Sequence, residues 1–150
     1  MRLIIQRVKQ ASVTIDNIIH GAIDQGFLVL VGIENKDSEE DINWLMNKLI
    51  GLRVFSDSEG KMNLSIKEIG GNILVVSQFT LFASTVKGNR PSFIRSAKPE
   101  IAIPIYQKFV DQLRLQSGFD IQTGVFGADM QIALINDGPV TIFIDSKNRE

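Results

Sequence analysis

The sequence predicts a single α+β domain over residues 1–150, with a mixed or antiparallel sheet that curls into a barrel-like shape under two main helices. Three observations favour this fold class. The length of 150 residues suits one domain rather than two. Apolar runs typical of strands outnumber the segments with helical periodicity. Hydrophobic residues make up 44% of the chain and charged residues 22%, which is ordinary for a globular protein with a substantial core.

The first third of the chain has the character of strands. Its predicted strands are residues 2–8, 12–15, 18–23 and 26–33. Lys9, Gln10 and Ala11 separate the first two strands, and the turn signal Asp16-Asn17 precedes the third. The fourth is a continuous apolar run that begins at a glycine, a pattern typical of a strand buried on both faces.

Two segments have the spacing of amphipathic helices. Ser38 or Asp37 can cap the first helix, which Gly51 ends. Its apolar stripe comprises Ile42, Leu45, Met46 and Leu49. The second helix should begin near Pro99 and end at Gly118, with Pro104 distorting or delaying its start. Its predicted stripe comprises Ile101, Ile105, Phe109 and Leu113.

Loops and further strands fill the rest of the chain. Residues 56–60 are a predicted loop, 70–72 a turn, and 73–83 a second long buried strand. The polar, basic residues 84–96 are a predicted loop. Three strands close the chain, around Ile121 and over residues 130–135 and 140–145.

Composition excludes several classes of chemistry. The chain has no cysteine, which excludes a disulfide scaffold, a thiolate nucleophile, an iron–sulfur cluster and cysteine-ligated zinc. A single histidine, His20, excludes multi-histidine metal sites. His20 lies at a predicted strand end or turn, where we favour a surface role over a catalytic one. We therefore expect no metal and no cofactor.

The hydropathy pattern predicts a soluble, cytoplasmic protein without a membrane partner. The longest uninterrupted apolar run, residues 27–31, is far shorter than the roughly 20 residues that span a bilayer. The first apolar residues are interrupted at once by Gln6 and Arg7, so no signal peptide is visible.

Charge is unevenly distributed although the net charge is −1. Residues 84–98 contain Lys87, Arg90, Arg95 and Lys98 and no acid, and residues 34–41 contain five acids and one lysine. Such asymmetry can produce one positive face on a nearly neutral protein. Two solvated loops account for the same charges equally well.

Two polar segments interrupt apolar strands where a site would be expected. Ser77, Gln78, Phe79 and Thr80 bring three hydrogen-bonding side chains to a buried strand, although Ser77 and Thr80 can also satisfy nearby backbone groups. The second segment is residues 136–139, Asn-Asp-Gly-Pro. Proline removes a backbone donor there and permits a cis bond, but spacing alone indicates only a turn.

These two segments, with the residues that follow them, resemble the signature motifs of the D-aminoacyl-tRNA deacylases of the bacterial and eukaryotic type. The resemblance rests on SQFTL at 77–81 and NDGPVT at 136–141. Three further matches occur in the expected order: Met-Arg at 1–2 with QRV at 6–8, GNRPSF at 88–93 and GVFGADM at 124–130. Each motif alone is weak, but all five in register cover the whole chain.

The resemblance implies a homodimer that hydrolyses the ester between a D-amino acid and the terminal adenosine at the acceptor end of tRNA, in translation quality control. It implies the same reaction on glycine mischarged on tRNA-Ala. By resemblance, Ser77, Gln78, Phe79 and Thr80 are the catalytic residues that line the pocket and the adenosine site. Phe126 and Met130 lie nearby.

The resemblance also implies how L-aminoacyl-tRNA is rejected. The Gly138-Pro139 bond would be cis, and its loop would enter the pocket of the partner subunit. Arg7 resembles the residue that holds this loop in its working orientation.

The chemistry that this picture requires is modest. Backbone N–H groups near Phe79 and Thr80 can receive the oxyanion, while the 2′-hydroxyl of the substrate positions water. No base is evident to activate Thr80, so we favour a positioning role over a nucleophilic one. Two alternatives remain: a non-enzymatic nucleic-acid-binding dimer that uses the basic loop, and an esterase for small esters or thioesters without tRNA.

Overall fold

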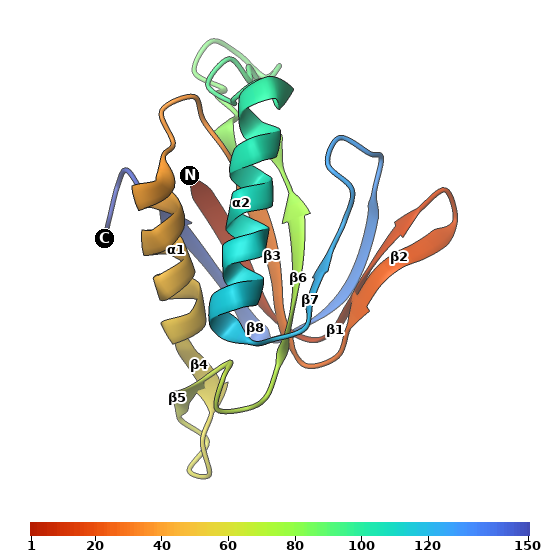
Figure 1. Ribbon diagram of the computed structural model, residues 1–150, viewed down its shortest axis with the longest axis vertical. Helices are drawn as coiled ribbons and strands as arrows, with labels where there is room; N and C mark the ends of the chain where they lie inside the picture. The colour runs from red at the N-terminus through yellow and green to blue at the C-terminus, as the bar shows by residue number, and fades with distance from the viewer.

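A six-stranded mixed sheet is the framework of the protein in a computed structural model that describes residues 1–150 (Figure 1). The strands are β1 (Arg2–Ile15), β2 (Ile18–Ile23), β3 (Gly26–Gly32), β6 (Asn72–Ser77), β7 (Ile121–Thr123) and β8 (Gln131–Asp145). Their order is β2-β1-β3-β6-β7, with β8 paired to β1. β1 pairs antiparallel with β2, β3 and β8, whereas β3–β6 and β6–β7 are parallel.

Two helices, α1 (Glu39–Gly51) and α2 (Pro99–Ser117), lie side by side over one face of the sheet (Figure 1). A short hairpin of β4 (Arg53–Ser56) and β5 (Met62–Ser65) follows α1, and the 3₁₀ helix η1 (Phe79–Phe82) follows β6. The predicted α+β fold, with a curled, barrel-like mixed sheet under two helices, is confirmed. No helix combines the length and the hydrophobicity needed to cross a membrane.

The main hydrophobic core lies between the helices and the sheet. The α1 stripe is buried as predicted, with every one of its four residues at most 1% exposed. The α2 stripe is rotated from the prediction, because Ile101 is 41% exposed and Ala102 and Tyr106 are buried with Phe109 and Leu113. α2 begins at Pro99 as expected, and Pro104 lies inside it, so the expected delay of its start is wrong.

Several predicted strand boundaries are wrong, and tertiary pairing explains two of them. Residues 9–11 do not break β1, because β8 and β2 pair with β1 through this region. Residues 136–139 do not separate two strands either, since β8 runs through them and the ladder with β1 shifts register there.

Two other boundaries depend on local conformation. β6 ends at Ser77 rather than at residue 83, and η1 follows it. The β4–β5 hairpin encloses the predicted loop 56–60, and its strands were not predicted.

The acidic segment 34–41, which leads into α1 and forms its first residues, is partly buried rather than solvated. Asp37 forms an ion pair with the N-terminal amine of Met1, which also donates to Ser146 Oγ at 2.7 Å. Asp41 accepts hydrogen bonds from the N–H and the hydroxyl of the N-cap residue Ser38, and its carboxylate lies 2.7 Å from Lys147 Nζ. These contacts join the start of the chain, α1 and the residues after β8.

Candidate active site

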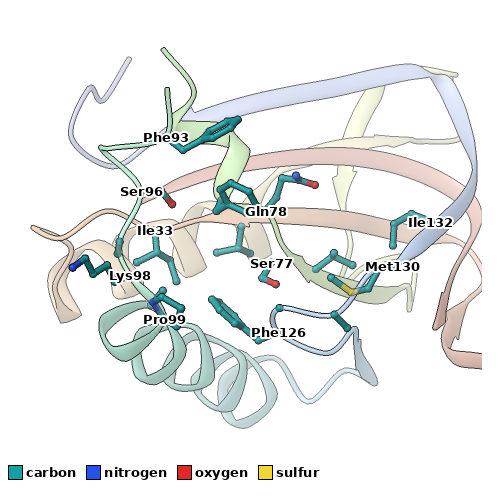
Figure 2. A pocket seen from close by; sticks show the side chains of 17 residues that line it. Ile33, Ser77, Gln78, Phe93, Ser96, Lys98, Pro99, Phe126, Met130 and Ile132 are labelled. Atoms are coloured by element: carbon teal, nitrogen blue, oxygen red, sulfur yellow. The ribbon is translucent and has the colours of Figure 1, made fainter. Parts of the chain in front are cut away.

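A pocket of about 490 Å³ opens where the parallel strands β3 and β6 end, next to the first turn of α2 (Figure 2). Val31 pairs with Ser77 at the end of this ladder, so both strands deliver their last residues to one edge of the sheet. The lining residues are Val31, Ile33, Val76, Ser77, Gln78, Phe79, Phe93, Ser96, Ala97, Lys98, Pro99, Ala102, Phe126, Gly127, Ala128, Met130 and Ile132. Most of these side chains are apolar, and Lys98 alone is ionisable.

The end of β6 forms one wall of the pocket. The backbone N–H of Gln78 donates to the carbonyl of Val31 at 2.7 Å, which fixes the chain as it leaves the sheet. The Gln78 side-chain amide then donates to Thr80 Oγ1. Phe79, 55% exposed, packs edge-on against Phe93 with 5.1 Å between ring centroids.

Two backbone donors beside this wall lack acceptors within the chain. Phe79 and Thr80 are the first two residues of η1, so their N–H groups have no partner inside the helix. No other backbone or side-chain group accepts from them either. Such donors can stabilise negative charge that develops on an ester oxygen.

η1 is seated against the sheet by a close approach at Gly32. A Cβ atom at this position would lie 2.9 Å from Leu81 Cβ and 3.2 Å from the carbonyl oxygen of Gln78, so a side chain there would displace η1. The guanidinium of Arg2 also lies over the Phe82 ring, 4.5 Å from its centroid. η1 therefore packs against β1 through Arg2 and against β3 through Gly32.

The loop between β7 and β8 forms the opposite wall, from which Phe126 and Met130 point into the pocket (Figure 2). The Phe126 ring packs against Tyr106 of α2 at 5.8 Å. The Tyr106 hydroxyl donates to the carbonyl of Val75 at 3.0 Å, and burial raises the pKa of this phenol, which keeps it protonated. Tyr106 therefore ties α2 to β6 beneath the pocket.

The segment that leads into α2 forms the third wall, and the sequence reasoning did not assign it to the site. Phe93, Ser96, Lys98 and Pro99 line the pocket here, and the N–H of Ala97 donates to the carbonyl of Ile33 at 2.9 Å. Phe93 is part of the GNRPSF motif, and this was the one sequence signal that could have placed the segment at the site.

Arg7, Gly138 and Pro139 lie outside this pocket. Arg7 is buried and donates from Nε to the carbonyl of Asp137 at 2.8 Å, and from Nη1 to the carbonyl of Val54. The Gly138-Pro139 bond is cis, and both residues are exposed. Gly138 has φ 141°, and a Cβ there would lie 3.0 Å from Arg7 Nη2. Arg7 therefore packs tightly against this segment of β8.

The structure brings together five of the predicted site residues, which are Ser77, Gln78, Phe79, Phe126 and Met130. Thr80 is not a lining residue, but its hydroxyl is joined to Gln78, which is. His20 is exposed on β2, where its Nδ1 lies 3.1 Å from the carbonyl oxygen of Thr123.

Comparison with known proteins places the chain in one family. The D-Tyr-tRNA(Tyr) deacylase family model matches residues 4–145. Over the full length of both chains, the sequence is 63% identical to a D-aminoacyl-tRNA deacylase of Flavobacterium psychrophilum and 59% identical to one of Phocaeicola vulgatus.

Solved structures are similar as well. A c-Myc DNA unwinding element binding protein is 40% identical, with a TM-score of 0.90 over 97% of this chain and 98% of the other. A probable eukaryotic D-amino acid tRNA deacylase shares the fold at 19% identity, with a TM-score of 0.80 over 95% of this chain and 97% of its own. Because the family model and the relatives match across nearly the whole sequence, the chain belongs to the D-Tyr-tRNA(Tyr) deacylase family.

Proposed function

We propose that the protein hydrolyses the ester bond of D-aminoacyl-tRNA and releases the free D-amino acid and tRNA. The observation that carries this proposal is the pocket at the end of β6, which Ser77, Gln78 and Phe79 line and beside which the N–H groups of Phe79 and Thr80 have no acceptor within the chain. Family membership and the names of full-length relatives support the substrate class. We place the reaction in the cytoplasm, where charged tRNA is used.

The proposed reaction uses water and the substrate itself. The pocket lining supplies no carboxylate or imidazole to act as a general base. In our mechanism the 2′-hydroxyl of the terminal adenosine positions a water molecule, whose oxygen attacks the ester carbonyl carbon. The N–H groups of Phe79 and Thr80 stabilise the resulting oxyanion. The carbon–oxygen bond to the ribose then breaks, and the ribose 3′-oxygen takes up the proton that the attacking water loses, passed on through the 2′-hydroxyl.

Thr80 has a positioning role in this proposal. Its hydroxyl accepts from the Gln78 side chain, which itself lines the pocket. No lysine, histidine or carboxylate forms a hydrogen bond with that hydroxyl, so nothing within the chain would activate it as a nucleophile. The pair thus orients Gln78 toward the bound adenosine or ester.

Selection between D and L substrates is assigned to the exposed Gly138-Pro139 segment of a second subunit. Arg7 binds the carbonyl of Asp137 and holds this segment outward from its own subunit, which suits a role in a partner's pocket. Fixed backbone carbonyls there would exclude an L side chain by steric clash and admit a D side chain or glycine. Glycine mischarged on tRNA-Ala is therefore a proposed second substrate.

The direct test is deacylation of matched D- and L-tyrosyl-tRNA by the purified protein. We expect rapid release of D-tyrosine, little release of L-tyrosine and full activity in chelator. Equal turnover of the two esters would contradict the proposal. Equal turnover of a free D-tyrosine ester and D-tyrosyl-tRNA would instead favour a general esterase.

Subunit mixing tests the role of the partner. Gly138→Ala impairs the loop, so its homodimer should release L-tyrosine as well as D-tyrosine. Gln78→Ala impairs the pocket, so its homodimer should be nearly inactive. Mixed dimers contain one intact pocket that faces one intact loop, and we expect their activity to be selective for D-tyrosyl-tRNA. A monomeric variant that retains full discrimination between the two esters would contradict this assignment.

A second candidate function is nucleic-acid binding without hydrolysis. The 40%-identical structure described as a c-Myc DNA unwinding element binding protein favours it, as do the basic residues 84–98. Duplex DNA binding that weakens steeply with salt, together with no release of D-tyrosine from D-tyrosyl-tRNA, would support this function instead.

A further inference from the structure

A short projecting loop stands beside the pocket and contains unpaired cations. Ser84 and Ser92 exchange two backbone hydrogen bonds of 2.8 Å, which close the base of residues 85–91. We call residues 84–98 the basic segment. At its tip Lys87 and Arg90 are exposed, and no carboxylate forms an ion pair with either. The tip is thus a constrained projection with two free positive charges.

The same segment forms part of the pocket. Phe93, Ser96 and Lys98 line it, and Arg95 lies between them with its guanidinium 5.5 Å from the centroid of the Phe82 ring. Arg95 is partly neutralised by Glu34, at 3.6 Å. Positive charge therefore continues from the pocket wall at Lys98 to the tip of the loop.

The other sides of the pocket carry no comparable charge. The wall from the β7–β8 loop has Asp129 as its one charged residue, and the first turn of α2 contains Glu100. A polyanion that leaves the pocket is attracted toward the basic segment and repelled from these two sides.

The basic segment also exposes apolar side chains. Val86 at the tip is 91% exposed, and Ile94, which follows the closed loop, is 88% exposed. They flank Lys87 and Arg90 along the chain. Alternating cations and apolar groups suit an unpaired nucleotide strand, which offers phosphates together with ribose and base faces.

We infer that the basic segment binds the phosphates of the single-stranded nucleotides that precede the terminal adenosine of tRNA, with Lys87 and Arg90 as the principal contacts. This inference rests on the proposed function, since it takes the pocket as the site of the terminal adenosine. In this inference Lys87 and Arg90 contribute to the affinity for tRNA and take no part in hydrolysis of the ester.

The test compares the Lys87→Ala/Arg90→Ala double variant with wild type on two substrates. One is D-tyrosyl-tRNA, and the other is the D-tyrosyl ester of adenosine, which has no phosphate. At about 0.1 M salt each lost phosphate contact weakens binding about fivefold, so KM for D-tyrosyl-tRNA should rise about 25-fold. The slope of log KM against log salt should fall by about 1.4. On the adenosine ester, kcat/KM should equal that of wild type.

A matched control removes two exposed lysines elsewhere. Lys61 and Lys67 lie in and after the β4–β5 hairpin, at the opposite end of the molecule from the basic segment (Figure 1). The Lys61→Ala/Lys67→Ala variant loses the same net charge and should keep the wild-type KM and salt slope.

The outcomes separate this inference from the proposed function. Wild-type protein that does not hydrolyse D-tyrosyl-tRNA contradicts the proposed function. Active wild type with an unchanged KM and salt slope in the loop variant overturns the inference alone. Equal losses on tRNA and on the adenosine ester also overturn it, because the loop would then act by shaping the pocket.

Discussion

The Nη1 group of Arg2 donates a 2.8 Å hydrogen bond to the backbone carbonyl of Leu81 and so joins the start of β1 to η1. The Nε group of the same side chain binds Asp145 at 2.8 Å. Arg2 therefore positions the short helix whose first two N–H groups lie beside the pocket, although Arg2 itself lies outside the pocket lining.

Replacing Arg2 with methionine should loosen η1 without removing a contact to the substrate, because Arg2 does not line the pocket. We expect kcat for D-tyrosyl-tRNA to fall about 10- to 100-fold with little change in KM, because small displacements of catalytic groups cost this much. Loss of the guanidinium hydrogen bonds to Leu81 and Asp145 should lower the free energy of unfolding by about 2 kcal/mol. Arg149→Met, which removes a surface arginine paired with Glu40, is the control and should keep wild-type kcat. A rise in KM at constant kcat would argue against this positioning role.

Replacing Thr80 with valine removes the hydroxyl and keeps the shape of the side chain. We expect a loss of about tenfold in kcat, because Gln78 loses the acceptor that orients it. Thr80→Ser retains an acceptor and should stay close to wild type. A loss beyond about 10⁴-fold in Thr80→Val, or a trapped D-aminoacyl-enzyme on the wild type, would indicate a nucleophile instead.

Replacing His20 with alanine should leave most of the deacylation rate intact. The imidazole is exposed on β2, contacts the carbonyl of Thr123 and lies outside the pocket lining, so it is not placed to accept a proton from water in the pocket. Steady-state rates of the variant and wild type on D-tyrosyl-tRNA give the answer. A loss above about a hundredfold, the low end of what a general base contributes, would revive a histidine mechanism.

Replacing Asp41 with asparagine should make stability less dependent on pH. Burial raises the pKa of Asp41, but hydrogen bonds from Lys147, Ser146 and Ser38 outweigh it and hold the pKa well below 3.8. A carboxyl whose pKa falls on folding stabilises the protein above its unfolded pKa and loses that contribution as the pH drops. We therefore expect Asp41→Asn to be about 2 kcal/mol less stable than wild type at pH 7.

Urea denaturation over a pH series measures this effect. The gap between wild type and Asp41→Asn should narrow as the pH falls below about 4. Asp111→Asn is the control, because Asp111 is 53% exposed and contacts only Arg114 and Gln107 on the same helix. It should differ from wild type by less than about 0.5 kcal/mol at every pH. A gap for Asp41→Asn that stays constant down to pH 2 would contradict the assignment.

The sequence predicted best those elements whose signal is local. The α1 stripe follows helical periodicity, and each of its four residues is buried as that periodicity requires. The polar residues at the end of β6 indicated a site because hydrogen-bonding side chains there interrupt a buried strand, and Ser77 and Gln78 do line the pocket.

The sequence did not predict the features that depend on contacts between residues far apart along the chain. Residues 79–82 are mostly apolar, as a strand would be, but in the structure the close approach at Gly32 and the Arg2–Leu81 bond hold them against the sheet as η1. The wall formed by Phe93 and Lys98 depends on the contact of Ala97 with Ile33, far back along the chain.

The pairing of β1 with β8 has a consequence for synthesis on the ribosome. β1 leaves the ribosome first, but its long partner consists of residues 131–145, and Met130 and Ile132 of the pocket come with it. Until these residues emerge, a nascent chain presents an unpaired β1 edge and an open pocket wall. An incomplete chain therefore has no competent site, and translation that stops before residue 131 should yield a product that aggregates rather than a partly active enzyme.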